Sequence, residues 1–189
     1  MRVIGGSARG RRLASPGNGH IRPTADRVKE SLFSILNSLL GNLDGLRVLD
    51  ICAGAGSLGI EALSRGAELA LFIDNHHESA RLVAKNLALS GLAMRGMILE
   101  KDAIVALDVL AGREKPFHLV FLDPPYRQGL AERILWRLST SPLVDFSTLV
   151  VVETEAREEL PADMGSLVQF DRRIYGDTAI VFFEKRPVV

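Results

Sequence analysis

The chain has 189 residues, of which 47% are hydrophobic and 24% are charged, and its formal net charge is zero. This composition is typical of a globular domain and argues against a disordered chain, while the apolar runs are too short to cross a membrane. The N-terminus lacks the apolar core of a signal peptide, and Cys52 is the only cysteine, with no Cys/His cluster of zinc spacing. We therefore expect one cytoplasmic domain over residues 1–189 that holds no metal.

The zero net charge hides an asymmetry between the start of the chain and the rest. Residues 1–30 contain seven basic and two acidic side chains, which gives this segment a net charge of +5. We interpret residues 1–22 as a basic arm, with a short strand and turn at Val3–Gly6, and such an arm is a candidate contact for nucleic acid. The alternative interpretation is a solvated terminal segment. The arginines concerned are Arg9, Arg11, Arg12, Arg22 and Arg27.

The first strong periodicity predicts a helix over residues 25–40, capped by Thr24 or Asp26 and ended by Gly41. Beyond Leu46, short apolar runs alternate with helical stretches. The predicted strands are Arg47–Ile51, Leu69–Ile73, Met97–Leu99, Leu119–Leu122 and Leu149–Val152, and the predicted helices between them are Ser57–Ser64, His76–Leu89, Ala103–Leu110 and Gly129–Leu138.

This alternation indicates an α/β fold with a mostly parallel sheet. The end of the chain differs, because Leu167–Tyr175 and Thr178–Glu184 flank Gly176-Asp177 and predict an antiparallel hairpin. In parallel sheets, ligands bind beyond the carboxyl ends of the strands, so the residues that follow each strand are the ones to inspect.

A glycine-rich turn follows the first predicted strand. Gly54, Gly56 and Gly59 match the spacing G-x-G-x-x-G between a strand and a helix, and Ala53 precedes them. Such a turn lets a ligand approach backbone amides at a helix N-terminus. It fits the pyrophosphate of a dinucleotide, the methionine and ribose parts of S-adenosylmethionine, or a purely structural turn.

Three aspartates stand at the ends of the first three predicted strands. Asp50 suits the ammonium group of a bound amino acid and would repel a pyrophosphate. Asp74 is placed to accept from ribose hydroxyls, which both cofactors carry. Asp102 is either an acceptor for an adenine amine or the cap of the following helix.

The most specific motif is Asp123-Pro124-Pro125-Tyr126, directly after the fourth predicted strand. Two prolines give a rigid extended segment without backbone donors. The motif offers a carboxylate, bare carbonyls and an aromatic ring, which suit a planar base with an exocyclic amine. Fixed acceptors stabilise the positive charge that reaches the amine nitrogen when it attacks a methyl sulfonium. A structural turn is the alternative interpretation.

Taken together, these motifs resemble those of the class I S-adenosylmethionine-dependent methyltransferases, and most closely the bacterial RsmD family, which methylates a guanine N2 of small-subunit ribosomal RNA. The resemblance extends to the opening segment around Ile4–Leu13 and to Arg22–Phe33. It implies a Rossmann-like fold with a seven-stranded, mostly parallel sheet and an antiparallel C-terminal hairpin strand. It also implies cofactor contacts at the glycine turn and strand ends, catalysis at Asp123–Tyr126, and ribosomal RNA, free or within an assembling subunit, bound by the basic arm.

Three other functions remain open at this point. An adenine-N6 nucleic-acid methyltransferase would use the same motif, and an NAD-dependent oxidoreductase would use the glycine turn and Asp74 but leaves Asp123-Pro124-Pro125 without a role. A ribosome-assembly factor without turnover is the third. Two further segments carry weaker interpretations: Thr24–Glu30 as a functional segment near the cofactor or RNA, and Glu153–Glu159 as a solvated acidic face.

Overall fold

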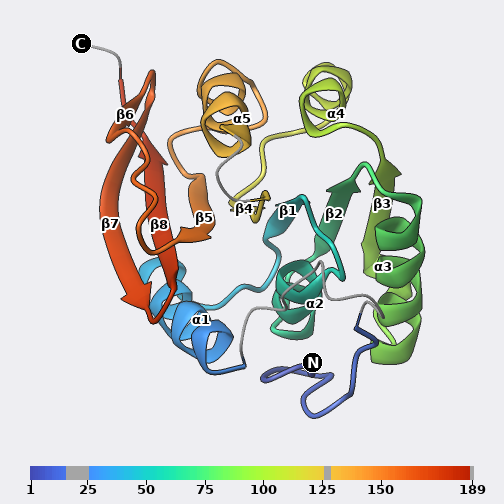
Figure 1. Ribbon diagram of the computed structural model, residues 1–189. Coiled ribbons are helices and arrows are strands. Elements are labelled where there is room, and N and C mark those ends of the chain that lie inside the picture. Colours follow the sequence, from blue (N-terminus) through green and yellow to red (C-terminus); the bar gives the residue numbers. More distant parts are fainter. Residues whose placement is uncertain (16–25, 126–128, 188–189) are drawn as a thin grey trace.

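The computed structural model describes residues 1–15, 26–125 and 129–187. It contains one eight-stranded sheet in the order β3-β2-β1-β4-β5-β8-β7-β6 (Figure 1). The strands are β1 (Arg47–Ile51), β2 (Leu69–Asp74), β3 (Gly96–Glu100), β4 (Leu119–Leu122), β5 (Leu149–Glu155), β6 (Asp163–Met164), β7 (Leu167–Tyr175) and β8 (Thr178–Lys185).

The neighbours among β1 to β5 pair in parallel, whereas β8, β7 and β6 pair antiparallel beyond β5. The Rossmann-like, mostly parallel sheet with a C-terminal hairpin is therefore confirmed. The expected count of seven strands is wrong, because β6 adds an eighth. This strand has two residues, which is too short to leave a periodic pattern in the sequence.

The described residues form five α-helices, which cover the two faces of the sheet. Helices α1, α2 and α3 lie on one face, and α4 and α5 lie on the other (Figure 1). None of the described helices is long and apolar enough to cross a membrane. The helices are α1 (Asp26–Leu40), α2 (Ser57–Ser64), α3 (His77–Ser90), α4 (Ala103–Leu110) and α5 (Leu130–Ser139), and a 3-10 turn η1 (Ala93–Arg95) precedes β3.

Strand alternation divides the core into two layers and fixes which way the site residues face. In β1, Val48 packs into the layer under α1, α2 and α3, while Leu49 and Ile51 pack into the layer under α4 and α5. Since successive side chains of a strand point to opposite faces, Asp50 lies on the same face as Val48. Phe121 packs into the same layer as Val48, and Asp123 follows Phe121 by two residues, so the same alternation places Asp123 on that face.

The N-terminal segment forms a hairpin that packs against the body. Val3 N donates to Arg11 O at 3.0 Å, and Gly10 N donates to Val3 O at 2.9 Å. Val3, Ala8 and Leu13 are buried in the same core layer as α1 and α2. The arm expected from the charge distribution is therefore folded over residues 1–15, and its continuation, with Arg22 and Thr24, lies outside the described residues.

The order of the strands reverses at β1. The chain moves from β1 outward to β2 and β3 and then returns to β4 on the other side of β1. Loops after β1 and β4 consequently leave the sheet side by side at its carboxyl edge, which is where a ligand binds in sheets of this kind.

Candidate active site

The turn after β1 is held in place by its own backbone and by two strand-end carboxylates. Gly54 N donates to Asp74 Oδ2 and Gly59 N donates to Asp50 Oδ2, both at 2.9 Å. Gly56 sits at the start of α2 with φ +74°, a left-handed conformation that favours glycine. A side chain on Gly59 would bring its Cβ to 2.4 Å from the Phe72 ring, so this glycine lets α2 pack on β2.

Asp50 is buried, and its environment disfavours the ionised form of its carboxyl group. Burial raises the pKa of this carboxyl to about 7, the hydrogen bond from Gly59 lowers it, and the nearby Asp74 raises it. A carboxyl whose folded-state pKa exceeds the unfolded value stabilises the fold at low pH, and this contribution is lost as the pH rises through about 7. A bound cation beside Asp50 would offset that loss by favouring the ionised form.

Asp74 and Asp102 both accept hydrogen bonds from nearby backbone N–H groups. Asp74 accepts from Gly54 N with one oxygen and from His76 N with the other, each at 2.9 Å. Asp102 caps α4, because its Oδ1 accepts from Ile104 N at 2.9 Å and from Val105 N at 3.2 Å. The capping interpretation of Asp102 is thus confirmed. A carboxylate oxygen accepts more than one hydrogen bond, so these contacts leave capacity for a ligand at both residues.

The segment after β4 begins beside the glycine turn. Asp123 N donates to Ile51 O of β1 at 3.2 Å, which ties the start of this segment to the first strand. Pro124 is buried and Pro125 is exposed, while Tyr126 lies outside the described residues. The pKa of the Asp123 carboxyl is raised well above its ordinary value, first by burial, then by Glu153 and then by Asp50.

The carboxyl groups at the strand ends act electrostatically on the thiol of Cys52, which lies in the turn after β1. The pKa of this thiol is raised to about 12, first by burial and then by Asp74, Asp123, Asp50 and Asp102, in that order. All four strand-end carboxyl groups therefore lie within electrostatic reach of one point in the turn. The structure brings together the carboxylates that the sequence placed at separate strand ends, and their combined field attracts a cation and repels an anion.

Glu153 is a member of this group that the sequence pattern did not reveal. The residue pair Leu122 and Val152 is in register between β4 and β5, so the next residues, Asp123 and Glu153, lie beside each other. Glu153 is 5% exposed, and the interpretation of Glu153–Glu159 as a solvated face is wrong at this position because Glu153 lies inside β5, a central strand of the sheet, where it pairs with Ile180 of β8. Among the described residues, no group of His, Cys, Asp and Glu is placed to hold a metal ion.

A second unpredicted feature is a buried charged cluster at the start of α2. Lys29 Nζ of α1 lies 2.6 Å from Arg2 O, 3.2 Å from Ser57 Oγ and 3.5 Å from Glu61 Oε2. Glu61 in turn accepts from the backbone N–H groups of Ile4 and Gly5, at 2.8 and 2.7 Å. This cluster joins the N-terminal hairpin and α1 to the helix that follows the glycine turn.

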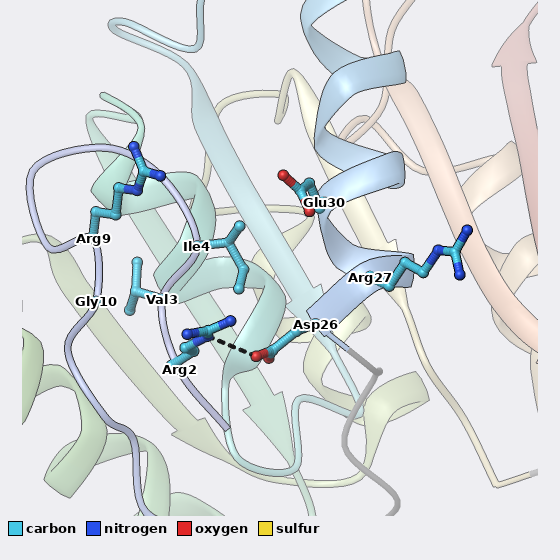
Figure 2. Close-up of a pocket in the computed structure, with 8 residues that line it drawn as sticks. All are labelled: Arg2, Val3, Ile4, Arg9, Gly10, Asp26, Arg27 and Glu30. Carbon is cyan, nitrogen blue, oxygen red and sulfur yellow. Dashed lines mark hydrogen bonds and ion pairs between the residues drawn. The ribbon is translucent and has the colours of Figure 1, made fainter.

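The arginines that the sequence assigns to RNA binding lie on the N-terminal hairpin, on α1 and outside the described residues. Arg9, Arg11 and Arg12 are exposed on the hairpin, and Arg11 Nη1 donates to Leu89 O of α3 at 3.1 Å. Arg9 and Arg27 line one hollow of about 360 Å³, with the hairpin on one side and α1 on the other (Figure 2). Arg2, paired with Asp26 at 2.8 Å, completes its basic lining, and Asp26 and Glu30 make it partly acidic. Arg22 lies outside the described residues.

Comparison with known proteins gives a consistent result over nearly the whole chain. The family model described as conserved hypothetical protein 95 matches residues 1–184. Ribosomal RNA small subunit methyltransferase D of Escherichia coli K12 is 33% identical, with 98% of this chain and 90% of that protein covered. The protein of the same name from Haemophilus influenzae is 36% identical over 85% of this chain and 81% of its own length. The solved structure of yhhF from Escherichia coli superposes with a TM-score of 0.82 at 33% identity, covering 98% and 97% of the two chains.

Proposed function

This chain belongs to the family described as conserved hypothetical protein 95, the RsmD family, and from that premise we propose that it methylates the exocyclic N2 amine of a guanine in small-subunit ribosomal RNA, with S-adenosylmethionine as the methyl donor. The fold is that of class I methyltransferases. The observation that carries the proposal is the Asp123-Pro124-Pro125 segment beside the glycine turn, with the half-buried carboxyl group of Asp123 at its head.

The residues around the turn fit the proposed cofactor by their charge. Four carboxyl groups lie within electrostatic reach of Cys52, and the negative charge that the ionised ones carry favours a sulfonium and disfavours the pyrophosphate of a dinucleotide. Asp50 would hold the ammonium of the methionine part and Asp74 the ribose hydroxyls, while Ala53, Gly54 and Gly56 line the turn. Asp102 would accept from the adenine amine. When bound, the cofactor supplies an electrophilic methyl group on a positively charged sulfur.

In the proposed reaction, the protein binds the exocyclic amine of the base and orients its nitrogen lone pair. Asp123 and a backbone carbonyl of the Pro124-Pro125 segment accept the two amine hydrogens, which leaves the nitrogen lone pair directed at the methyl carbon. Tyr126 is assigned to stack on the base. The N–C bond would form as the methyl C–S bond breaks, so that S-adenosylhomocysteine leaves as a neutral thioether and the positive charge passes to the nitrogen, where the fixed acceptors stabilise it. The nitrogen would then lose one proton, to Asp123 or to water, and become neutral again. Alignment of the two reactants supplies a further reduction of the barrier, up to about 7–11 kcal/mol in well-oriented systems.

The direct test is to incubate the purified protein with S-adenosylmethionine and small subunits, or their naked RNA, from a strain that lacks its own enzyme of this family. We expect N2-methylguanosine at one position when the RNA is digested and analysed by mass spectrometry. N6-methyladenosine would favour the adenine alternative. If neither modified nucleoside forms on either substrate, the proposal is wrong.

The basic hairpin is proposed to bind the RNA backbone. Replacing Arg9, Arg11 and Arg12 together by alanine is expected to weaken RNA binding and to reduce the slope of log K against log salt by about 0.7 for each lost phosphate contact with single-stranded RNA. Filter binding at several salt concentrations measures both. A triple variant that binds RNA with the affinity and salt slope of the wild type would contradict this role.

A further inference from the structure

A half-buried carboxyl group, Asp123, and a buried one, Glu153, lie side by side at the carboxyl edge of the sheet, and the mechanism above uses the first of them. Register places Asp123 next to Glu153, since the preceding residues Leu122 and Val152 are paired between β4 and β5. Glu153 is also held from its other side, where it pairs with Ile180 of β8. Its backbone position is therefore fixed by two neighbouring strands.

Both side chains point to the same face of the sheet. Phe121 and Val151, two residues earlier in each strand, belong to the core layer under α1, α2 and α3, while Leu122 and Val152 belong to the opposite layer. Alternation then returns Asp123 and Glu153 to the first face. Phe33 of α1 closes this layer by packing on Phe121, with ring centroids 5.9 Å apart.

Two carboxyl groups at adjacent positions of neighbouring strands, one buried and one half-buried, do not both ionise freely, because each negative charge opposes the other. Among the described residues, the titratable groups that act on Asp123 or feel its charge are Glu153 of β5, Asp50 of β1 and Cys52 of the turn after β1. Glu153 has the largest effect of the three on the pKa of Asp123, after burial itself, and raises it.

We propose that Glu153 is a positioning residue for Asp123: the two carboxyl groups share one proton in the free protein, and Glu153 thereby sets the pH at which Asp123 becomes the ionised acceptor of the base amine. The proposal rests on the function proposed above for Asp123. It assigns to Glu153 no contact with the base or the cofactor.

The test is the pH dependence of kcat/KM for methyl transfer, measured from about pH 5 to pH 9, because this quantity reports ionisation in the free enzyme. Asp123 must be ionised to accept, and a neighbouring charge raises its pKa, so Glu153→Gln removes that charge and lowers the pKa. We expect the acid limb of the profile to move to lower pH by about one unit. Glu153→Asp keeps the charge and should keep the limb near its wild-type position.

The exposed Glu159 provides a matched control, since Glu159→Gln removes the same charge outside the pair and should leave the limb unmoved. A Glu153→Gln variant whose rate falls equally at every pH, with an unmoved limb, would show a purely structural residue and overturn the proposal. A wild-type acid limb near pH 4, the ordinary value for a carboxyl, would overturn it without any variant.

A stability measurement separates this inference from the proposed activity. The carboxyl pair destabilises the fold as the pH rises through its raised pKa, so Glu153→Gln should unfold at a higher temperature than the wild type at pH 9, with the difference shrinking toward pH 5. If this pattern appears and methyl transfer does not, the pair exists but the proposed function is wrong. If the difference between the two proteins is independent of pH, the pair does not share a proton.

Discussion

Replacing Asp123 by asparagine is expected to lower the rate of methyl transfer by about 100- to 1000-fold, the size of effect seen when one preorganised polar partner of a transition state is removed. Asparagine has nearly the same shape but one neutral carbonyl oxygen in place of the carboxylate. It therefore accepts a hydrogen bond from the base amine without stabilising the positive charge that develops on the nitrogen. Transfer of a labelled methyl group from S-adenosylmethionine to ribosomal RNA measures the loss.

Cofactor binding should persist in the same variant, because the residues assigned to the cofactor lie on β1, on β2 and in the turns that follow β1 and β3, apart from the segment after β4. Calorimetric titration with S-adenosylhomocysteine checks this point. Asp163→Asn, an exposed position on the edge strand β6, is the matched control and should retain full activity. Loss of cofactor binding together with turnover would reassign Asp123 to the cofactor or to folding.

The contrast between Asp123 and Glu153 illustrates what the sequence could predict about the site. Asp123 was predicted because it follows a short apolar run and precedes two prolines, which are local signals. Glu153 also follows an apolar run, but it opens a stretch of acidic residues that reads as solvent-exposed. Its burial depends on the place of β5 inside the sheet, between β4 and β8, and the pairing of strands distant in the chain leaves no local pattern.

The same distinction holds for the fold. The strands β1 and β4 were predicted with their observed ends. Strand β4 is buried on two faces and is a continuous apolar run, and β1 is also buried and is mainly apolar apart from Arg47 and Asp50. The strand β3 was predicted two residues too short, as Met97–Leu99 within Gly96–Glu100. It lies at the edge of the sheet, where its side chains are largely exposed, so its hydrophobic pattern is weak.

The buried cluster at Lys29 was not predicted either, because it also depends on packing between segments that are distant in the sequence. Lysine and glutamate are almost never fully buried unless they are paired, so each reads as a surface residue in a helical pattern. Yet the side chains of Lys29 and Glu61 are both 0% exposed. The pairing depends on the packing of α1 against α2, and it holds the N-terminal hairpin through the hydrogen bonds from Ile4 and Gly5 to Glu61.

Replacing Lys29 by methionine is expected to reduce the free energy of unfolding by about 3–5 kcal/mol, because it leaves the buried Glu61 carboxylate without its nearest α1 partner. The apolar stem is kept, so packing is nearly unchanged, while Arg2 O and Ser57 Oγ lose their donor. Urea unfolding measures the change, and Lys115→Met, at an exposed position, should stay within about 0.5 kcal/mol of the wild type.

Adding Glu61→Gln to Lys29→Met should recover part of the loss, because the carboxylate charge that Lys29 balanced is then gone while an acceptor for the hairpin N–H groups remains. A loss below about 1 kcal/mol for Lys29→Met would mean that water or Arg65, which lies 2.8 Å from Glu61, already compensates the carboxylate, and that the hairpin does not depend on Lys29.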